Sequence, residues 1–229
     1  MCVLAMTDVA RVVRRRNQRR RRVGVAYDTA VEVAGLIPRN TRLLDVGCGE
    51  GFVAHHLSAL LGTNVVGVDL SAATDAQIEY MSYDGTRIPV TDHSFDGVLL
   101  SYVLHHVQDI HLVLAEVRRV VRNGGLVVVY EDIPKDWRDR FPCWAHDMKW
   151  RRRVGPCTFR RPPEWEALFR SYGLEIQSEH QISRWRNIFH PVGHTLYILK
   201  AGGTSTGQNK VLPADRSKSV YADSHAANN

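Results

Sequence analysis

Three aspartates stand where apolar segments end, and a glycine-rich turn follows the first of them. Asp45 lies inside the run 43–51 (Leu-Leu-Asp-Val-Gly-Cys-Gly-Glu-Gly), and Asp69 and Asp84 each close a later segment. A glycine turn lets the backbone approach a ligand that a Cβ would block. One such aspartate often caps a helix or forms a turn, but three at successive strand ends favour a polar, nucleotide-like ligand.

Two histidines and a carboxylate are the candidates for reaction chemistry. His105 and His106 follow the strand expected at 95–101, and Glu131 ends the strand expected at 125–130. A neutral imidazole or a carboxylate can take a proton from a hydroxyl, a thiol or a carbon acid. We expect the two histidines to point to different sides, so that at most one faces the substrate. The alternatives are that both histidines pack or cap the next helix, and that Glu131 is a solvated strand end.

A segment rich in aromatic and basic residues, 132–163, follows the fifth strand. All five tryptophans fall between Trp137 and Trp185. We expect this insert to contribute to a substrate pocket through Trp144, Trp150 and Arg152. The alternative is that its rings only pack the insert onto the domain.

Hydrophobic spacing predicts the elements that position these residues. Helices are expected at 25–37, 51–61 and 109–122, the last ending at Asn-Gly-Gly 123–125, with a very short one around 72–77. Strands are expected at 42–46, 64–69, 78–83, 95–101, 125–130, 174–183 and 194–200, of which the final two pair antiparallel. The predicted fold is α/β: a doubly wound, Rossmann-like, mostly parallel seven-stranded sheet whose last strand is antiparallel.

Charge divides the chain. Residues 1–26 hold eight arginines and one acid, a net charge of +7, and the remainder holds 22 basic and 23 acidic residues, a net charge of −1. We expect a flexible or loosely helical basic arm at 1–22, a folded domain at 23–201 and a disordered tail at 202–229. Such an arm is often only solvated, but residues 11–22 could also bind nucleic acid or an anionic surface.

Composition narrows the class of protein. An apolar fraction of 44% suits a globular chain, and no run is long enough to span a bilayer. The N-terminus does not resemble a secretory signal, and the four cysteines lack metal-ligand spacing. We therefore expect reduced thiols, no bound metal and a cytoplasmic location; a mitochondrial location is the alternative if the arginine-rich N-terminus is a presequence.

Five segments together resemble the class I S-adenosylmethionine-dependent methyltransferases, and within them the type 11 group that includes the ubiquinone and menaquinone C-methyltransferases. The segments are 43–51, 65–71 (Val-Val-Gly-Val-Asp-Leu-Ser), 84–89 (Asp-Gly-Thr-Arg-Ile-Pro), 94–98 (Ser-Phe-Asp-Gly-Val) and 116–125 (Glu-Val-Arg-Arg-Val-Val-Arg-Asn-Gly-Gly). The resemblance is strong over residues 25–131 and weak over 162–200.

The resemblance implies S-adenosyl-L-methionine as the cofactor and assigns its contacts. Its amino acid end would meet Asp45, Gly47, Cys48, Gly49 and Gly51. Its ribose would meet Asp69 and Leu70, its adenine Asp84 and Gly85, and its methyl end Ser101.

The implied function is methyl transfer to a small-molecule acceptor at an O, C, S or N atom. A nucleic-acid methyltransferase guided by the arginine arm is an alternative, but the residues 101–104 (Ser-Tyr-Val-Leu) lack the Pro-Pro motif of base-amine methyltransferases. Another alternative is a non-catalytic, cofactor-binding partner subunit. The cysteines match arsenite methyltransferases poorly.

Overall fold

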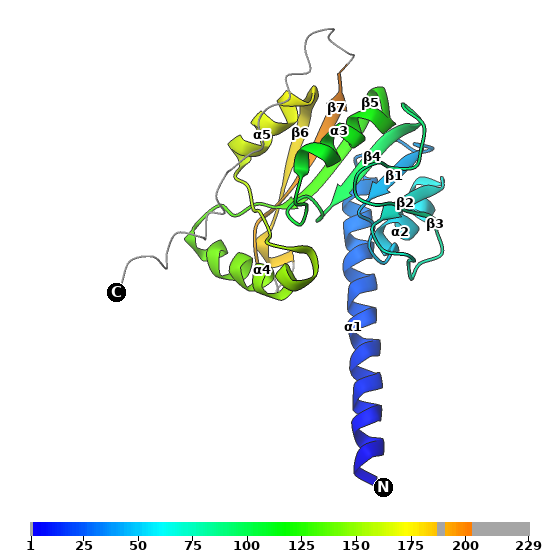
Figure 1. Ribbon diagram of the computed structural model, residues 1–229, viewed down its shortest axis with the longest axis vertical. Helices are drawn as coiled ribbons and strands as arrows, with labels where there is room; N and C mark the ends of the chain where they lie inside the picture. The colour runs from blue at the N-terminus through cyan, green and yellow to red at the C-terminus, as the bar shows by residue number, and fades with distance from the viewer. Residues whose placement is uncertain (1, 187–190, 203–229) are drawn as a thin grey trace.

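A computed structural model describes residues 2–186 and 191–202 of the chain (Figure 1). Helices alternate with strands along most of it, as the hydrophobic spacing predicts. The helices are α1 (Cys2–Ala34), α2 (Phe52–Leu61), α3 (Ile110–Val120), α4 (Arg140–Val154) and α5 (Pro162–Ser171), with short 3-10 turns η1 (Trp137–Asp139) and η2 (Arg184–Arg186). The strands are β1 (Leu43–Val46), β2 (Val65–Asp69), β3 (Glu79–Ser82), β4 (Phe95–Ser101), β5 (Val121–Asp132), β6 (Leu174–Ile182) and β7 (His194–Ala201).

The strands form one seven-stranded sheet in the order β3-β2-β1-β4-β5-β7-β6. The first five strands are parallel, and β7 runs antiparallel to both β5 and β6. The predicted fold class and its antiparallel last strand are therefore confirmed. Because β1 lies between β2 and β4, the carboxyl ends of the parallel strands bring Asp45, Asp69 and Ser101 to one edge of the sheet.

Helices cover both faces of the sheet, and each face has its own apolar core. On one face α3 and α5 pack against β4, β5 and β7 through side chains such as Leu114, Val117 and Phe169. On the other face α1 and α2 pack through Val33, Leu57 and Leu61. The central strands β1, β2 and β4 carry few polar residues, as expected of strands buried on both sides.

The N-terminal segment differs from the prediction. One helix runs from Cys2 to Ala34, so the arm expected at 1–22 and the helix expected from residue 25 are a single element. Alanine and arginine favour a helix and valine tolerates one. The single glycine of this segment, Gly24, costs about 1 kcal/mol, which is not enough to end the helix. Figure 1 shows that the C-terminal part of α1 packs against the domain, while its N-terminal part extends away from it.

Two further predictions about local structure are wrong. No helix forms at 72–77, where the chain is irregular before β3. Helix α3 ends at Val120, and Asn123-Gly124-Gly125 lies inside β5, which starts four residues earlier than expected. The β4–β5 register shifts there, and a Cβ on Gly125 would lie 2.8 Å from the Asp96 carbonyl oxygen. The glycine is therefore needed for a bulge in the strand and not for a helix cap.

The insert folds as η1 and α4 over the end of β5. A small apolar cluster of Cys143, Cys157, Phe159 and Val192, with Trp150 packed against it, holds α4 in place. The tail expected from 202 onward lies outside the described residues beyond Gly202. Among the described helices, none has a stretch long and apolar enough to cross a membrane.

Candidate functional site

The glycine turn between β1 and α2 is shaped by close packing. Gly47, Gly49 and Gly51 have φ values of 75°, 55° and 77°, a region that favours glycine. A Cβ on Gly47 would lie 2.3 Å from Val103 Cγ2, whereas one on Gly49 would meet nothing within 4 Å. The turn therefore packs against the residues after β4 on one side and leaves open space at Gly49.

The N–H groups of this turn bond within the chain. Gly47 donates to the Val68 carbonyl (2.8 Å), Gly49 to Asp69 Oδ2 (2.9 Å) and Gly51 to the Cys48 carbonyl (2.9 Å). Cys48 also donates to the Val68 carbonyl, and burial raises the pKa of its thiol well above the usual range. In this conformation the turn is thus held by β2, and Cys48 is a protonated thiol at its centre.

Asp45 is a buried carboxyl group whose Oδ2 has no hydrogen-bond partner among the described residues. Burial, with a smaller contribution from the nearby charge of Asp69, raises its pKa to about 7. A carboxylate in this position is costly without a partner, and a cationic or donor group of a ligand would supply one.

Asp69 and Asp84 accept hydrogen bonds from nearby turns and can accept further ones. Asp69 accepts from Gly49 N through Oδ2 and from Ser71 N through Oδ1. Asp84 Oδ1 accepts from the N–H and hydroxyl of Thr86 and from Arg87 N, and these bonds lower its pKa. A carboxylate has about four lone-pair sites, so both side chains can accept more bonds.

The remaining predicted cofactor residues lie along the same edge. Ser101 ends β4, and its buried Oγ has no partner among the described residues. Leu70 is 64% exposed, and its Cδ2 would lie 3.2 Å from a Cβ on Gly85. The structure therefore brings the ends of β2 and β3 together, as the pattern of three strand-end aspartates predicts.

His105 and His106 point to the same place, contrary to our expectation. The Nε2 atom of each lies 3.3 Å from Nε2 of His146, a residue of α4. The reason is that residues 102–107 form a turn that begins at Tyr102 with φ 54°, and in a turn successive side chains need not alternate. Neither histidine caps α3, because Asp109 does so.

Glu131 is buried and fixes this turn. Its Oε1 accepts from Leu104 N (2.6 Å), and its Oε2 lies 2.5 Å from His105 Nδ1. Burial alone would lower the pKa of His105, but the charge and hydrogen bond of Glu131 raise it. Burial, followed by the neighbouring charge of His105, lowers the pKa of His106 to about 3. His106 is therefore neutral at physiological pH and a poor general base.

The three residues predicted to bind the substrate do not lie together. Trp150 lies four residues after His146 on one face of α4, and its ring centroid is 5.7 Å from that of His106. Trp144 is about 200° around the helix from His146, is 49% exposed and contacts Phe141. Arg152 is exposed near the end of α4. Only Trp150 is thus placed beside the histidines.

Sequence reasoning missed His146 and the role of Cys157. Cys157 Sγ lies 3.3 Å from His106 Nδ1, and burial raises the pKa of this thiol to about 12. A second buried histidine–carboxylate pair, His194 Nδ1 and Asp132 Oδ1 at 2.7 Å, lies next to Glu131 along β5. His146 is 40 residues from His106, so no local spacing could have revealed the contact; a histidine in the aromatic insert was the available signal.

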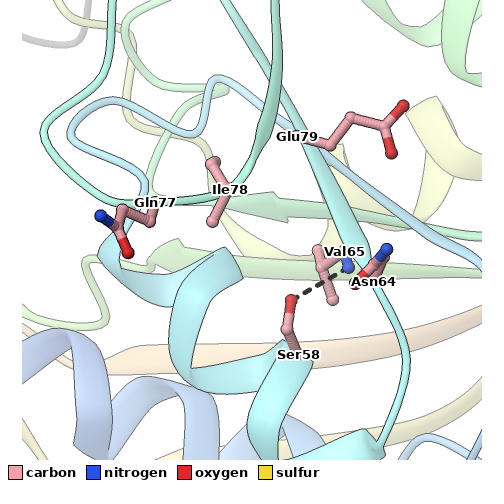
Figure 2. Close-up of a pocket in the computed structure, with 6 residues that line it drawn as sticks. All are labelled: Ser58, Asn64, Val65, Gln77, Ile78 and Glu79. Atoms are coloured by element: carbon pink, nitrogen blue, oxygen red, sulfur yellow. Dashed lines mark hydrogen bonds between the residues drawn. The ribbon is translucent and has the colours of Figure 1, made fainter.

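Figure 2 shows a different, open pocket at the opposite edge of the sheet. Its lining comes from α2, the start of β2 and the chain around the start of β3: Ser58, Asn64, Val65, Gln77, Ile78 and Glu79. Ser58 Oγ accepts from Val65 N at 3.0 Å and is thus used structurally. Doubly wound sheets bind ligands at the carboxyl ends of their strands, so this pocket is not the candidate site.

Comparison with known families covers the part of the chain that holds the glycine turn and the histidine pair. Residues 44–129 match the family described as "Methyltransferase domain". This part of the chain is therefore similar to class I methyltransferase domains.

Relatives and solved structures agree with this assignment. A ubiquinone biosynthesis O-methyltransferase of Rhizobium etli is 32% identical over 125 residues, which are 47% of this chain and 50% of the relative. A 27-O-demethylrifamycin SV methyltransferase of Amycolatopsis mediterranei is 32% identical over 170 residues, which are 67% of this chain and 61% of the relative. A SAM-dependent methyltransferase structure from Thermotoga maritima superposes with a TM-score of 0.63 at 19% identity and covers 81% of this chain and 95% of that one.

The chain spans about half the length of the first of these curated relatives. The matched methyltransferase domain holds the glycine turn, the three strand-end aspartates and the histidine pair. Glu131 and α4, with His146, lie beyond it, so the residues that close the site on this side are not described by the family match.

Proposed function

We propose that this chain is an S-adenosylmethionine-dependent methyltransferase that acts on a small, apolar or aromatic acceptor. The observation that carries the proposal is the buried Asp45 carboxyl group. One of its oxygens has no partner within residues 2–186 and 191–202, and it lies at the edge where the strand-end residues gather. A buried acceptor of this kind fits the ammonium group of the methionine part of the cofactor.

The other residues of this edge suit the rest of the cofactor. Asp69 would accept from the ribose hydroxyls, and Asp84 with Gly85 would meet the adenine. The open space at Gly49 lies on the same edge, as does Ser101 Oγ, which has no partner in the part of the chain that the structure describes. When bound, the cofactor supplies an activated methyl group on a sulfonium. The protein's own contribution is then to hold the acceptor in line and to exclude water.

Two features support an apolar or aromatic acceptor. Trp150 and Phe159 flank the histidines, with the Phe159 ring stacked 5.2 Å from that of His105. The relatives named above act, by their names, in ubiquinone biosynthesis and on a rifamycin, which are both ring compounds. We assign an orienting role to the histidines, because a pKa of about 3 leaves His106 little capacity to take a proton.

Transfer of labelled methyl groups tests this function. Cofactor labelled in its methyl group would be incubated with the chain and with quinols, phenols, thiols or tRNA. We expect label in at least one class of small acceptor, and loss of that label in Asp45→Asn but not in the control Asp96→Asn, which lies at the amino end of β4, away from the ligand edge. Label in tRNA alone would contradict the small-molecule assignment.

Helix α1 favours a nucleic-acid acceptor as a second candidate. Its described arginines between residues 14 and 22 are all exposed, on a helix that extends from the domain (Figure 1). Binding through such residues would weaken steeply with salt, since each phosphate contact releases counterions. RNA binding that falls with salt and is lost when residues 1–18 are removed, together with tRNA methylation, would support this candidate.

A further inference from the structure

Three histidine nitrogens converge next to the methyltransferase domain. One ligand nitrogen from each of His105, His106 and His146 lies within 4.8 Å of the other two. His146 Nε2 lies 3.3 Å from Nε2 of His105 and 3.3 Å from Nε2 of His106. His105 is buried and the other two are half-buried, so the group is at the boundary between the domain and α4.

These separations match those of zinc ligands. Histidine nitrogens bind Zn²⁺ at about 2.0–2.1 Å in a tetrahedral arrangement, which places two of them about 3.3–3.4 Å apart. Two of the three separations in the cluster are therefore those expected of nitrogens bound to one zinc ion, and the third is at most 4.8 Å.

Hydrogen bonding among the rings explains the cluster less well. Glu131 accepts from Nδ1 of His105, so in the neutral ring Nε2 of His105 carries a lone pair. If Nε2 of His106 also carries a lone pair, a single proton on His146 Nε2 would have to be shared between two acceptors, each 3.3 Å away. A cation would satisfy all three nitrogens together.

The groups behind the histidines resemble the support that metal ligands need. Glu131 orients His105 through its Nδ1 and is itself held by Leu104 N at 2.6 Å. Cys157 Sγ contacts Nδ1 of His106 at 3.3 Å. Metal-ligating histidines commonly bond a carboxylate or another acceptor through the second ring nitrogen, which fixes the tautomer and the ring orientation.

We propose that His105, His106 and His146 bind a divalent transition metal, with zinc as the best fit, through their Nε2 atoms. Three imidazoles suit borderline cations such as Zn²⁺ and Co²⁺ and do not suit Mg²⁺ or Ca²⁺. Three protein ligands are typical of sites that keep a fourth position for water or substrate. The proposal replaces the expectation of no metal, and it does not depend on methyl transfer.

Metal binding is tested on the full chain prepared without a polyhistidine tag. The chain is mixed with one equivalent of ZnCl₂, desalted and analysed for zinc, and CoCl₂ is used in parallel for its visible absorption. The variants are His146→Ala, His106→Ala and Glu131→Gln. The control is His55→Ala, which removes one histidine of the other adjacent pair, His55 and His56. Circular dichroism checks that each variant is folded.

We expect one zinc ion per parent chain and per His55→Ala chain, and at least a tenfold loss of affinity in both ligand variants. Glu131→Gln should retain the site but weaken it by roughly 10–100-fold, as loss of a supporting carboxylate does elsewhere. A folded parent that retains no zinc and gives no cobalt spectrum would overturn the proposal, as would equal zinc binding in His146→Ala and the parent. Because no cofactor or acceptor is present, failure here is distinct from failure of the proposed methyl transfer.

Discussion

At the scale of single residues, Asp45 couples stability to ligand binding. Its pKa is raised to about 7 in the folded chain, against an ordinary value of 3.8, so the folded state holds a proton that the unfolded state releases between these two pH values. The folded state therefore loses stability as the pH rises from about 4 to 7, and the loss is complete above pH 7.

Asp45→Asn removes this dependence. We expect the variant to gain roughly 2–4 kcal/mol over the ligand-free parent above pH 7 and little near pH 4, since one pKa unit corresponds to about 1.4 kcal/mol. The same variant should bind cofactor more weakly. Melting temperatures between pH 4.5 and 8.5 measure the effect, and parallel curves for variant and parent would show that Asp45 has an ordinary pKa.

Trp150 and Trp144 lie about 120° apart around α4 and should respond differently. Trp150→Ala removes a ring beside His106 and His146, so it should raise the KM for an identified acceptor and lower stability by about 1–3 kcal/mol, less than a fully buried tryptophan costs. Trp144→Ala, at a half-exposed position, should leave both nearly unchanged. Acceptor kinetics and melting curves on the two variants show which ring lies beside the acceptor. A larger kinetic effect of Trp144→Ala than of Trp150→Ala would place the acceptor on the outer face of α4.

At the scale of elements, the sequence predicted the helices and strands whose bounds follow from local hydrophobic spacing. Strands β1, β2 and β4 and helix α2 agree to within one residue, because their apolar runs end at clear turn residues. The prediction that residues 123–125 end a helix was wrong. In a single sequence, glycines that allow a bulge in a strand such as β5 cannot be told from glycines that end a helix.

The candidate site likewise has a part that the sequence predicts and a part that it does not. The strand-end residues were predictable, since parallel strands that follow one another bring their carboxyl ends to one edge. The histidine cluster was not, because it depends on how α4 folds back over β5 and so on contacts between residues 40 positions apart, such as His106 and His146.

Removal of residues 1–18 tests the role of α1. Arg19 and Arg22, which contact Phe52 and Glu50, remain in this variant. The packed end of α1, with Ala30 and Val33 buried, also remains. We therefore expect the melting temperature and the turnover of a small acceptor to stay close to those of the parent. Turnover that falls while cofactor binding persists would show that the N-terminal part of α1 captures the acceptor.

At the scale of the whole molecule, the sheet has an apolar core on each face and a candidate ligand site at the carboxyl ends of its parallel strands. Helix α4 covers part of this edge. The residues that would hold the cofactor come from β1, β2, β4 and the turns after them and from the turn after β3, while the histidine cluster joins the end of β4 to α4. Cofactor binding should therefore be separable from changes in α4, and a fold shared with other methyltransferases does not by itself define the acceptor.

Binding of S-adenosylhomocysteine to the intact chain tests the central claim most directly. Calorimetric titration and thermal unfolding should show one site of micromolar affinity. Ligand at 100 times its dissociation constant should add about 2.7 kcal/mol of stability. For a chain of this size that gain raises the melting temperature by about 5–10 °C. Absence of both heat and thermal shift at millimolar ligand, in a chain shown to be folded, would contradict the account.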